Sequence, residues 1–250
     1  MPPLIIIAKI MLITVALTFA SFQDLRTREI DDKVWIYTVP VGALLTVYEA
    51  LTTQGYPLVL AGLSVVLTAV IALGIFYTGL FGGADAKALI ALAAALPLPP
   101  YQNFASPFYP LTVLGNGLIL SLLLIPACLS WNFIFAIKTK GKNGALFEGI
   151  RATRAQKFVA ILTGVRVKPA TAGLVHFNLM ERVSADGEHV LKFFHKVEER
   201  EGSKLIDPRS RAVWVTPAIP MIVFFLAGFL LSFAVGDIIF QAVALVLGVV

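Results

Sequence analysis

Two aspartates, Asp24 and Asp85, lie directly beside long apolar segments, where a carboxylate is costly unless it has a function. Asp24 follows the apolar run 4–22, and Asp85 lies between the apolar run 58–80 and the alanine-rich run 86–98. Two apolar crossings separate them, so both are expected at the same side of a bilayer. If the helices meet, two close carboxyl groups share one proton, and such a pair can activate water and protonate a leaving amine.

The helix ends suggest different roles for the two carboxyl groups. Asp24 is expected at the carboxyl end of its helix, where the helix dipole disfavours an anion. Asp85 follows a Gly-Gly pair and is expected at a helix start, where free backbone N–H groups favour the ionised form. We therefore predict that Asp24 is protonated and Asp85 is the ionised base at rest, as in the chemistry of aspartic proteases.

The residues around Asp85 suit an extended peptide substrate. Gly82 and Gly83, together with Gly79, allow a tight turn or a close backbone approach, although an ordinary loop turn would use the same residues. Lys87 is expected to be an anchor at the inner face, with holding the substrate or tuning Asp85 as the alternative. Gly82, Gly83 and Lys87 are thus candidate substrate-binding residues.

The composition predicts an α-helical polytopic membrane protein. The chain is 58% hydrophobic and 14% charged over 250 residues, with mean hydropathy +0.86, which a soluble fold could not bury. About six transmembrane helices are expected, since a crossing takes about 20 residues. The long apolar runs are 4–22, 34–51, 58–80, 111–137 and 213–233, the shorter run 86–98 makes the sixth, and a short apolar segment, 238–250, ends the chain.

Basic residues give the expected orientation, because Lys and Arg collect in short cytoplasmic loops. Of the 20 Lys and Arg, 15 lie between Lys138 and Arg211, and all but one of the rest lie in or beside the loops 23–33 and 79–87. The exception is Lys9, which either snorkels outward or faces the bundle. We expect the N-terminus outside and the aspartates at the cytosolic face of the cell membrane. The net charge of +5 is expected to reflect binding to anionic lipid rather than to nucleic acid.

Residues 138–212 are expected to form a small α+β cytosolic domain between helices five and six. The segment is rich in charge, with a helix-like part at 147–161 and strand-like runs at 164–168, 174–183 and 189–197. Transmembrane helices one to five, 1–137, carry both aspartates, and 213–250 holds helix six with the apolar end. The histidines in the domain have no metal-binding spacing and are expected to be solvated: His176, His189 and His195. Cys128 is expected to serve packing.

Four other acidic residues receive structural explanations. Asp31 and Asp32 precede helix two and are expected to cap it. Glu49 and Asp237 are expected to be interfacial charges at the outer helix ends.

Two motifs together resemble a known family. GGADAK, from Gly82, and QDLRTREID, from Gln23, are similar to the paired-aspartate signature of membrane aspartyl peptidases with a Gly-x-Gly-Asp motif. The pattern most resembles archaeal preflagellin peptidases and the type IV prepilin peptidase family. This resemblance covers the six spans, the positions of both aspartates and the cytosolic domain.

The resemblance implies an endopeptidase that removes the short basic leader from preflagellin or prepilin-like precursors at the cytosolic face. Asp24 and Asp85 would be the catalytic pair, with no cofactor and no metal. Ala84 departs from the motif, which has glycine there. The paired cysteines of bacterial prepilin peptidases are missing, so proteolysis without N-methylation is expected, and Gln23 before Asp24 differs from the Tyr-Asp motif of presenilin-like relatives.

Two other classes use the same residues differently. A proton- or cation-coupled transporter could use membrane aspartates as relays, although both lie at one face and no inverted repeat is visible. A scaffold for filament assembly would leave both aspartates dispensable.

Overall fold

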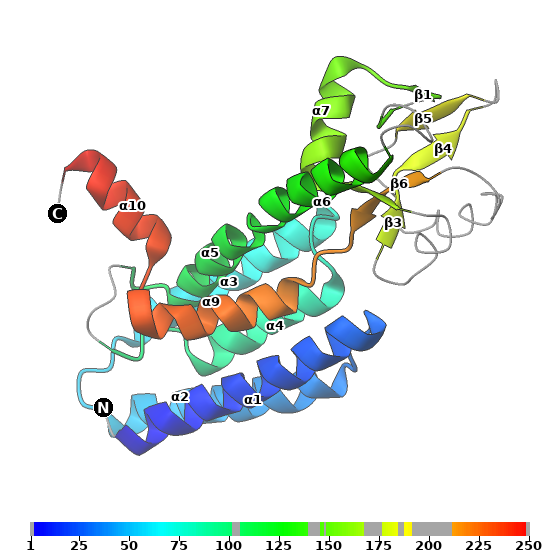
Figure 1. Cartoon of the computed structure of the whole chain (residues 1–250). Helices are drawn as coiled ribbons and strands as arrows, with labels where there is room; N and C mark the ends of the chain where they lie inside the picture. Colours follow the sequence, from blue (N-terminus) through cyan, green and yellow to red (C-terminus); the bar gives the residue numbers. More distant parts are fainter. Residues whose placement is uncertain are drawn as a thin grey trace. The chain divides into compact units, whose positions relative to one another are not determined.

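A computed structural model describes residues 3–101, 106–139, 146–147, 149–167, 177–184, 188–191 and 212–248 (Figure 1). The chain divides into two compact units. The first unit consists of Met1–Ser121 with Pro220–Val250, and the second unit is Leu122–Ile219. The domain division expected at residues 138 and 212 stays a prediction.

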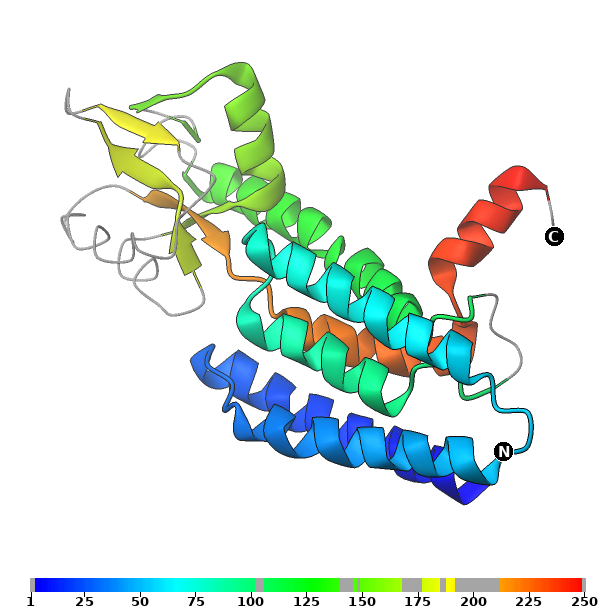
Figure 2. The same ribbon diagram turned by 180° about the vertical axis from the view of Figure 1, so that it is seen from behind.

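The first unit is a bundle of helices in which the short helix α4 (Gly83–Ala95) is central. It packs mainly against α2 and α3 and also contacts α1, α5 and α9, and Figures 1 and 2 show it between the α1–α2 pair and the other three. Its small side chains permit this close packing on several sides, and seven of its 13 residues are buried. The other helices are α1 (Pro3–Thr27), α2 (Lys33–Thr52), α3 (Leu58–Tyr77), α5 (Tyr109–Ser121), α9 (Met221–Val235) and α10 (Ile238–Leu247).

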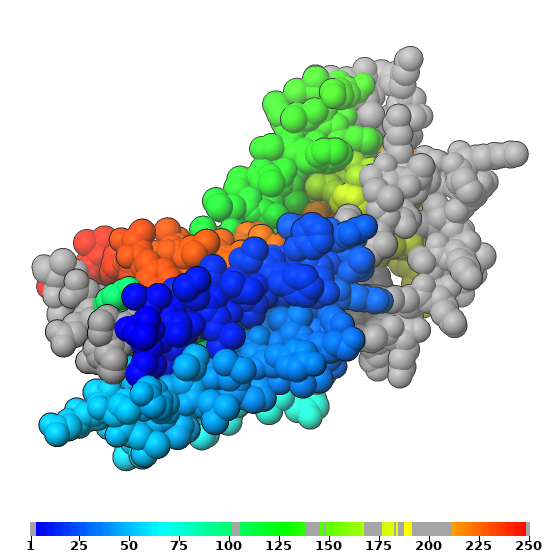
Figure 3. Space-filling model, turned by 90° about the horizontal axis from the view of Figure 1, so that it is seen from below, coloured from blue at the N-terminus to red at the C-terminus, as the bar shows by residue number. Residues whose placement is uncertain are grey.

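The helices with the dimensions of membrane spans are α1, α2 and α3 of the first unit and the stretch Tyr109–Lys138, which continues into the second unit. Among the described residues, four helical stretches are long and apolar enough to cross a bilayer, or five if the α9–α10 pair, bent by 53°, counts as one. The count of six is therefore not confirmed: with 13 residues, α4 is about 20 Å long, shorter than the hydrocarbon core. Figure 3 shows α1 and α2 side by side on one face. The large exposed apolar side chains of α1 include Ile7, Met11, Val15, Phe19 and Phe22.

The expected span at 213–233 is wrong at its beginning. Val213–Pro217 is the strand β6, and helix α9 starts only at Met221. Val213, Trp214 and Val215 are buried, and β6 pairs with two neighbouring strands. β-branched and aromatic residues followed by prolines favour a central strand that stops before a helix.

The second unit combines helices with two three-stranded sheets. The sheets have the orders β1-β5-β4 and β2-β6-β3, and every pairing is antiparallel except β1 with β5. The Asn132 side chain of α6 donates to the carbonyls of Ile161 and Gly164, and it accepts from the Arg166 N–H. Cys128 packs on β2 and β6, which confirms its packing role. The elements are α6 (Leu124–Thr139), β1 (Ile150–Arg151), α7 (Arg154–Thr163), β2 (Val165–Val167), β3 (Phe177–Leu179), β4 (Glu181–Val183), β5 (His189–Leu191) and β6.

The expected elements of this unit are only partly right. The helix expected at 147–161 begins at Arg154, where Thr153 and Gln156 form a capping box, and Ile150–Arg151 is a strand. The strand expected at 174–183 is two short strands in different sheets, separated at Met180. Residues 174–176 and 192–197 of the expected strands lie outside the described residues.

Candidate active site

Asp24 lies in the last turn of α1 on the face that packs into the bundle. Its exposed fraction is 8%, and α1 contacts α4. The side chain of Arg28, one turn further on, places Nη1 3.4 Å from Asp24 Oδ1. Asp24 is therefore a buried carboxyl group with a cationic partner, at the end of the helix where the dipole disfavours an anion.

Asp85 lies in the first turn of α4, where it forms half of a capping box. Its Oδ2 accepts the backbone N–H of Gly82, the N-cap residue, at 2.9 Å. This hydrogen bond satisfies a backbone donor at the helix start that would otherwise lack a partner. It also fixes the Asp85 carboxyl group close to the helix start.

Helices α1 and α4 are in contact, and Asp85 lies close enough to Asp24 for the Asp24 charge to act on it. Burial is the largest influence and raises the pKa of Asp85 to about 6; the Asp24 charge raises it further, while the Gly82 N–H and Arg28 lower it. Burial thus outweighs the backbone N–H of the helix start, which by itself would favour the ionised form. Which member holds the shared proton stays a prediction.

Lys87 connects α4, which carries Asp85, to the start of α2. Its Nζ lies 2.6 Å from Asp32 Oδ1, although both side chains are substantially exposed. Asp32 occupies the N-cap position of α2 but makes no side-chain cap, whereas Asp31 accepts the Lys33 N–H at 3.0 Å. The capping expectation is thus wrong for Asp32, whose carboxylate instead binds the first turn of α4.

The glycines before α4 serve different purposes. Gly79 has φ +76°, which only glycine adopts without strain. A Cβ on Gly82 would lie 3.3 Å from Asp85 Oδ2, so a side chain there would crowd the carboxylate. Gly83 has ordinary space, and Ala84 lies inside the helix, where alanine is favoured. Binding of substrate by Gly82 and Gly83 stays a prediction.

Arg28 was not identified from the sequence as part of this site. Its spacing of four residues from Asp24 near a helix end is the usual spacing of a helical ion pair, and that signal could have found it. The helix boundary was needed to show that the two side chains meet.

A groove of about 390 Å³ runs along α1 and α2 at the same end of the helices. Its apolar wall comes from both helices, and Gln23, the residue before Asp24, forms part of its polar end with Asp31 and Lys33. The apolar lining residues are Leu12, Val15, Ala16, Phe19, Val34 and Tyr37.

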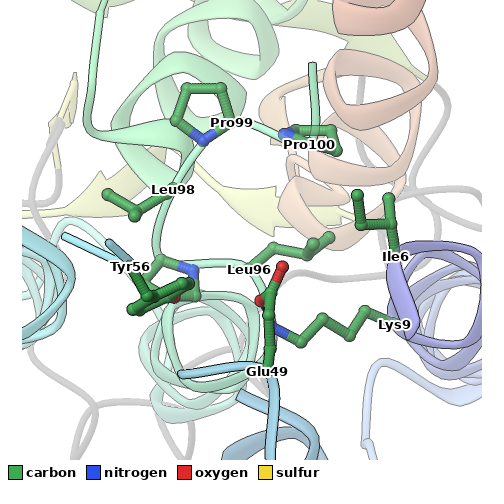
Figure 4. A pocket seen from close by; sticks show the side chains of 9 residues that line it. Ile6, Lys9, Glu49, Tyr56, Leu96, Leu98, Pro99 and Pro100 are labelled. Carbon is green, nitrogen blue, oxygen red and sulfur yellow. The ribbon is translucent and has the colours of Figure 1, made fainter. Parts of the chain in front are cut away.

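Lys9 and Glu49 form a buried ion pair toward the other end of α1 and α2 (Figure 4). Lys9 Nζ lies 2.5 Å from Glu49 Oε2, and the two residues are 1% and 4% exposed. Tyr56 and Leu96 line the small cavity beside them. Lys9 thus faces the bundle, and the prediction that Glu49 is an interfacial charge is wrong.

Asp237 also differs from its expected interfacial position. It is 8% exposed, accepts the Phe240 N–H as N-cap of α10, and accepts the Thr112 hydroxyl at 2.7 Å. His189 lies 3.3 Å from Glu181, whereas His176 and His195 lie outside the described residues. Within the described residues, no group of three or more His, Cys, Asp or Glu could hold a metal ion.

The arrangement is that of a helical membrane protein with two interacting carboxyl groups at one end of its bundle. The family model described as the type IV leader peptidase family matches residues 11–136, half of the chain, including both aspartates. The chain belongs to this family. A second model, described as the archaeal peptidase A24 C-terminus of type II, matches residues 156–238.

Three relatives extend the similarity over most of the chain. The preflagellin peptidases of Methanococcus maripaludis and Methanococcus voltae are each 27% identical, and the alignments cover 88% of this chain and 92% of each relative. The preflagellin peptidase of Methanocaldococcus jannaschii is also 27% identical, over 89% of this chain and 92% of its own.

Proposed function

We propose that this protein is a membrane aspartic endopeptidase that cleaves the short basic leader from preflagellin or type IV prepilin-like precursors. One observation supports the aspartic mechanism: Asp24 and Asp85, 61 residues apart in sequence, lie on the contacting helices α1 and α4, close enough for the Asp24 charge to act on Asp85. The names of the three relatives support preflagellin as the substrate.

The pair supports acid–base hydrolysis of a peptide bond. The ionised carboxylate takes a proton from a water molecule, whose oxygen attacks the scissile carbonyl carbon. The protonated carboxyl group donates to the carbonyl oxygen, and the leaving amine then takes a proton from the pair. Burial favours this use, because a close carboxyl pair in a poorly solvated site holds one proton up to higher pH.

The distribution of basic residues supports cleavage at the cytosolic face. The loops 23–33 and 79–87, beside the aspartates, carry Arg26, Arg28, Lys33 and Lys87, whereas the loop 52–57 carries no basic residue. The N-terminus would then be outside. The groove along α1 gives an apolar segment of the substrate a path that ends at Gln23, the residue before Asp24.

The test is cleavage of preflagellin with its leader intact, by membranes that contain wild type, Asp24→Asn or Asp85→Asn. Each single variant is expected to lose at least about a hundredfold in rate while it inserts at the normal level. Glu29→Gln, an exposed carboxyl group in the same loop region, is the matched control and should cleave as wild type. Cleavage by either aspartate variant at the wild-type rate would remove that residue from the mechanism. If wild type leaves every leader offered intact, the transporter and scaffold alternatives remain.

A further inference from the structure

Arg28 has an unusual backbone conformation directly beside the aspartate pair. Its φ is +61°, and among the described residues it alone, apart from glycines, has a positive φ. Residues with a Cβ disfavour this left-handed region. Helices commonly end in this way on glycine, so an arginine here is a costly choice whose benefit should lie in its side chain.

The side chain of Arg28 points back to the site. The left-handed turn follows a hydrogen bond from the Arg28 N–H to the Asp24 carbonyl, at 3.2 Å, and Nη1 lies 3.4 Å from Asp24 Oδ1. The Arg28 and Asp24 side chains are only 15% and 12% exposed. The Arg28 charge also acts on Asp85, so one guanidinium influences both carboxyl groups.

Four of the other charged groups at this end of the described bundle form two ion pairs. Lys87 of α4 pairs with Asp32, and Lys33 of α2 pairs with Asp31. Glu29 is exposed, and α9, which packs on α1, has no ionisable side chain. Glu49 of α2 lies toward the other end of the helix, where it binds Lys9.

We propose that Arg28 is a positioning residue, whose guanidinium, aimed by the left-handed backbone, sets the pH range in which the aspartate pair holds one proton. The inference rests on the proposed function, because it concerns the same pair. It adds a cation that sets the pKa values of the pair to a mechanism that otherwise needs only two carboxyl groups.

The sign of the effect follows from charge. Activity requires one ionised and one protonated carboxyl group, so the rate falls below the first pKa of the pair and above the second. A nearby cation favours the ionised forms and lowers both pKa values. Loss of Arg28 should therefore move both limbs of the pH–rate profile to higher pH, by about one unit or more.

The experiment compares three substitutions of Arg28 through the pH dependence of kcat/KM for preflagellin cleavage. Arg28→Gln removes the charge and should shift both limbs upward. Arg28→Lys keeps the charge and should restore most of the wild-type profile. Arg28→Gly also removes the charge but fits the backbone without strain, so it should shift the profile as Arg28→Gln does, with a melting temperature no lower than that of wild type.

Arg26→Gln is the matched control, since Arg26 is exposed in the same last turn of α1. Its profile should superimpose on that of wild type. A profile of Arg28→Gln that superimposes on wild type would overturn the inference, and so would an equal shift in Arg28→Lys. If Arg28→Gln is inactive at every pH, ¹³C NMR titration of the Asp85 carboxyl group decides: a raised midpoint supports the inference and an unchanged midpoint overturns it.

Failure of this inference is distinguishable from failure of the proposed function. The proposed function fails if wild type does not cleave or if the aspartate variants do. The inference alone fails if wild type cleaves, both aspartate variants are inactive, and the Arg28 variants keep the wild-type profile.

Discussion

At the scale of single residues, the Asp85 carboxyl group is subject to opposing influences. Burial and the Asp24 charge raise its pKa, whereas the Gly82 N–H and Arg28 lower it. Burial is the largest, so a group at a helix start does not have the low pKa that the dipole alone would give. With a pKa of about 6, Asp85 titrates close to neutral pH, where small changes in its surroundings alter its protonation.

Removing the charge of Asp24 should lower the pKa of Asp85. In Asp24→Asn one raising influence disappears while Arg28 stays, so the midpoint should fall below about 6 yet stay above the ordinary aspartate value, because burial remains. ¹³C NMR titration of labelled aspartate carboxyl groups would measure it. Glu29→Gln, with an exposed side chain, should leave the midpoint unchanged. An unchanged midpoint in Asp24→Asn would mean that the two carboxyl groups are not coupled.

Residue types and their position along the chain were enough to single out Asp24 and Asp85. They were not enough for Arg28 or Asp32, because the contacts of these residues depend on where α1 ends and on how the α1–α2 loop meets α4. Glu49 was misinterpreted for the same reason: its partner Lys9 lies 40 residues away, and nothing local marks the pair.

At the scale of elements, the Lys87–Asp32 ion pair connects the start of α4 to the start of α2. Reversing one charge, as in Asp32→Lys, should slow preflagellin cleavage by about two- to fivefold, the effect expected of one partly exposed ion pair. The double variant Asp32→Lys with Lys87→Asp should recover most of the rate.

The exposed pair Arg151–Glu188 of the second unit, 2.9 Å apart, provides the control for this charge swap. Reversal of its charges should not change cleavage. If the double variant at Asp32 and Lys87 is no faster than the single one, the pair does not act by joining the two segments.

The α5–α9 contact depends on two glycines. A Cβ on Gly228 would lie 2.6 Å from the Gly117 backbone nitrogen and 2.8 Å from the Val113 carbonyl oxygen. Backbone atoms cannot rotate aside, so Gly228→Ala must push the helices apart and should cost about 1–3 kcal/mol of stability. Thermal unfolding in detergent would measure the loss. Gly62→Ala in α3, where nothing lies within 4 Å, should be neutral or slightly stabilising.

Hydropathy predicted the long helices α1, α2 and α3 well, because each is a continuous apolar run. It was wrong at β6, whose apolar residues are buried in protein rather than in lipid, and the span expected at 86–98 is not confirmed. The strand β6 and the central helix α4 are both apolar and both enclosed by neighbouring elements, and hydropathy alone does not distinguish these two environments.

At the scale of the whole molecule, the proposed orientation can be tested with single cysteines. After replacement of the buried Cys128, a cysteine at the exposed Gln54 should react with a membrane-impermeant thiol reagent in intact cells. A cysteine at the exposed Glu29 should react only after the membrane is opened. The basic residues at one side predict this pattern. The reverse pattern of labelling would place the aspartates outside and contradict cytosolic cleavage.

The buried Lys9–Glu49 pair has a consequence for how the chain enters the membrane. An unpaired lysine costs about 2.5–3.5 kcal/mol on insertion at the centre of an apolar helix and less toward its end, where Lys9 lies, and a glutamate in the next helix adds its own cost. Because the two side chains are partners at 2.5 Å, these costs are reduced only when α1 and α2 are together. The first two helices are therefore expected to leave the translocation machinery as one hairpin. Helix α1, which carries Asp24, would then enter the lipid already packed against α2.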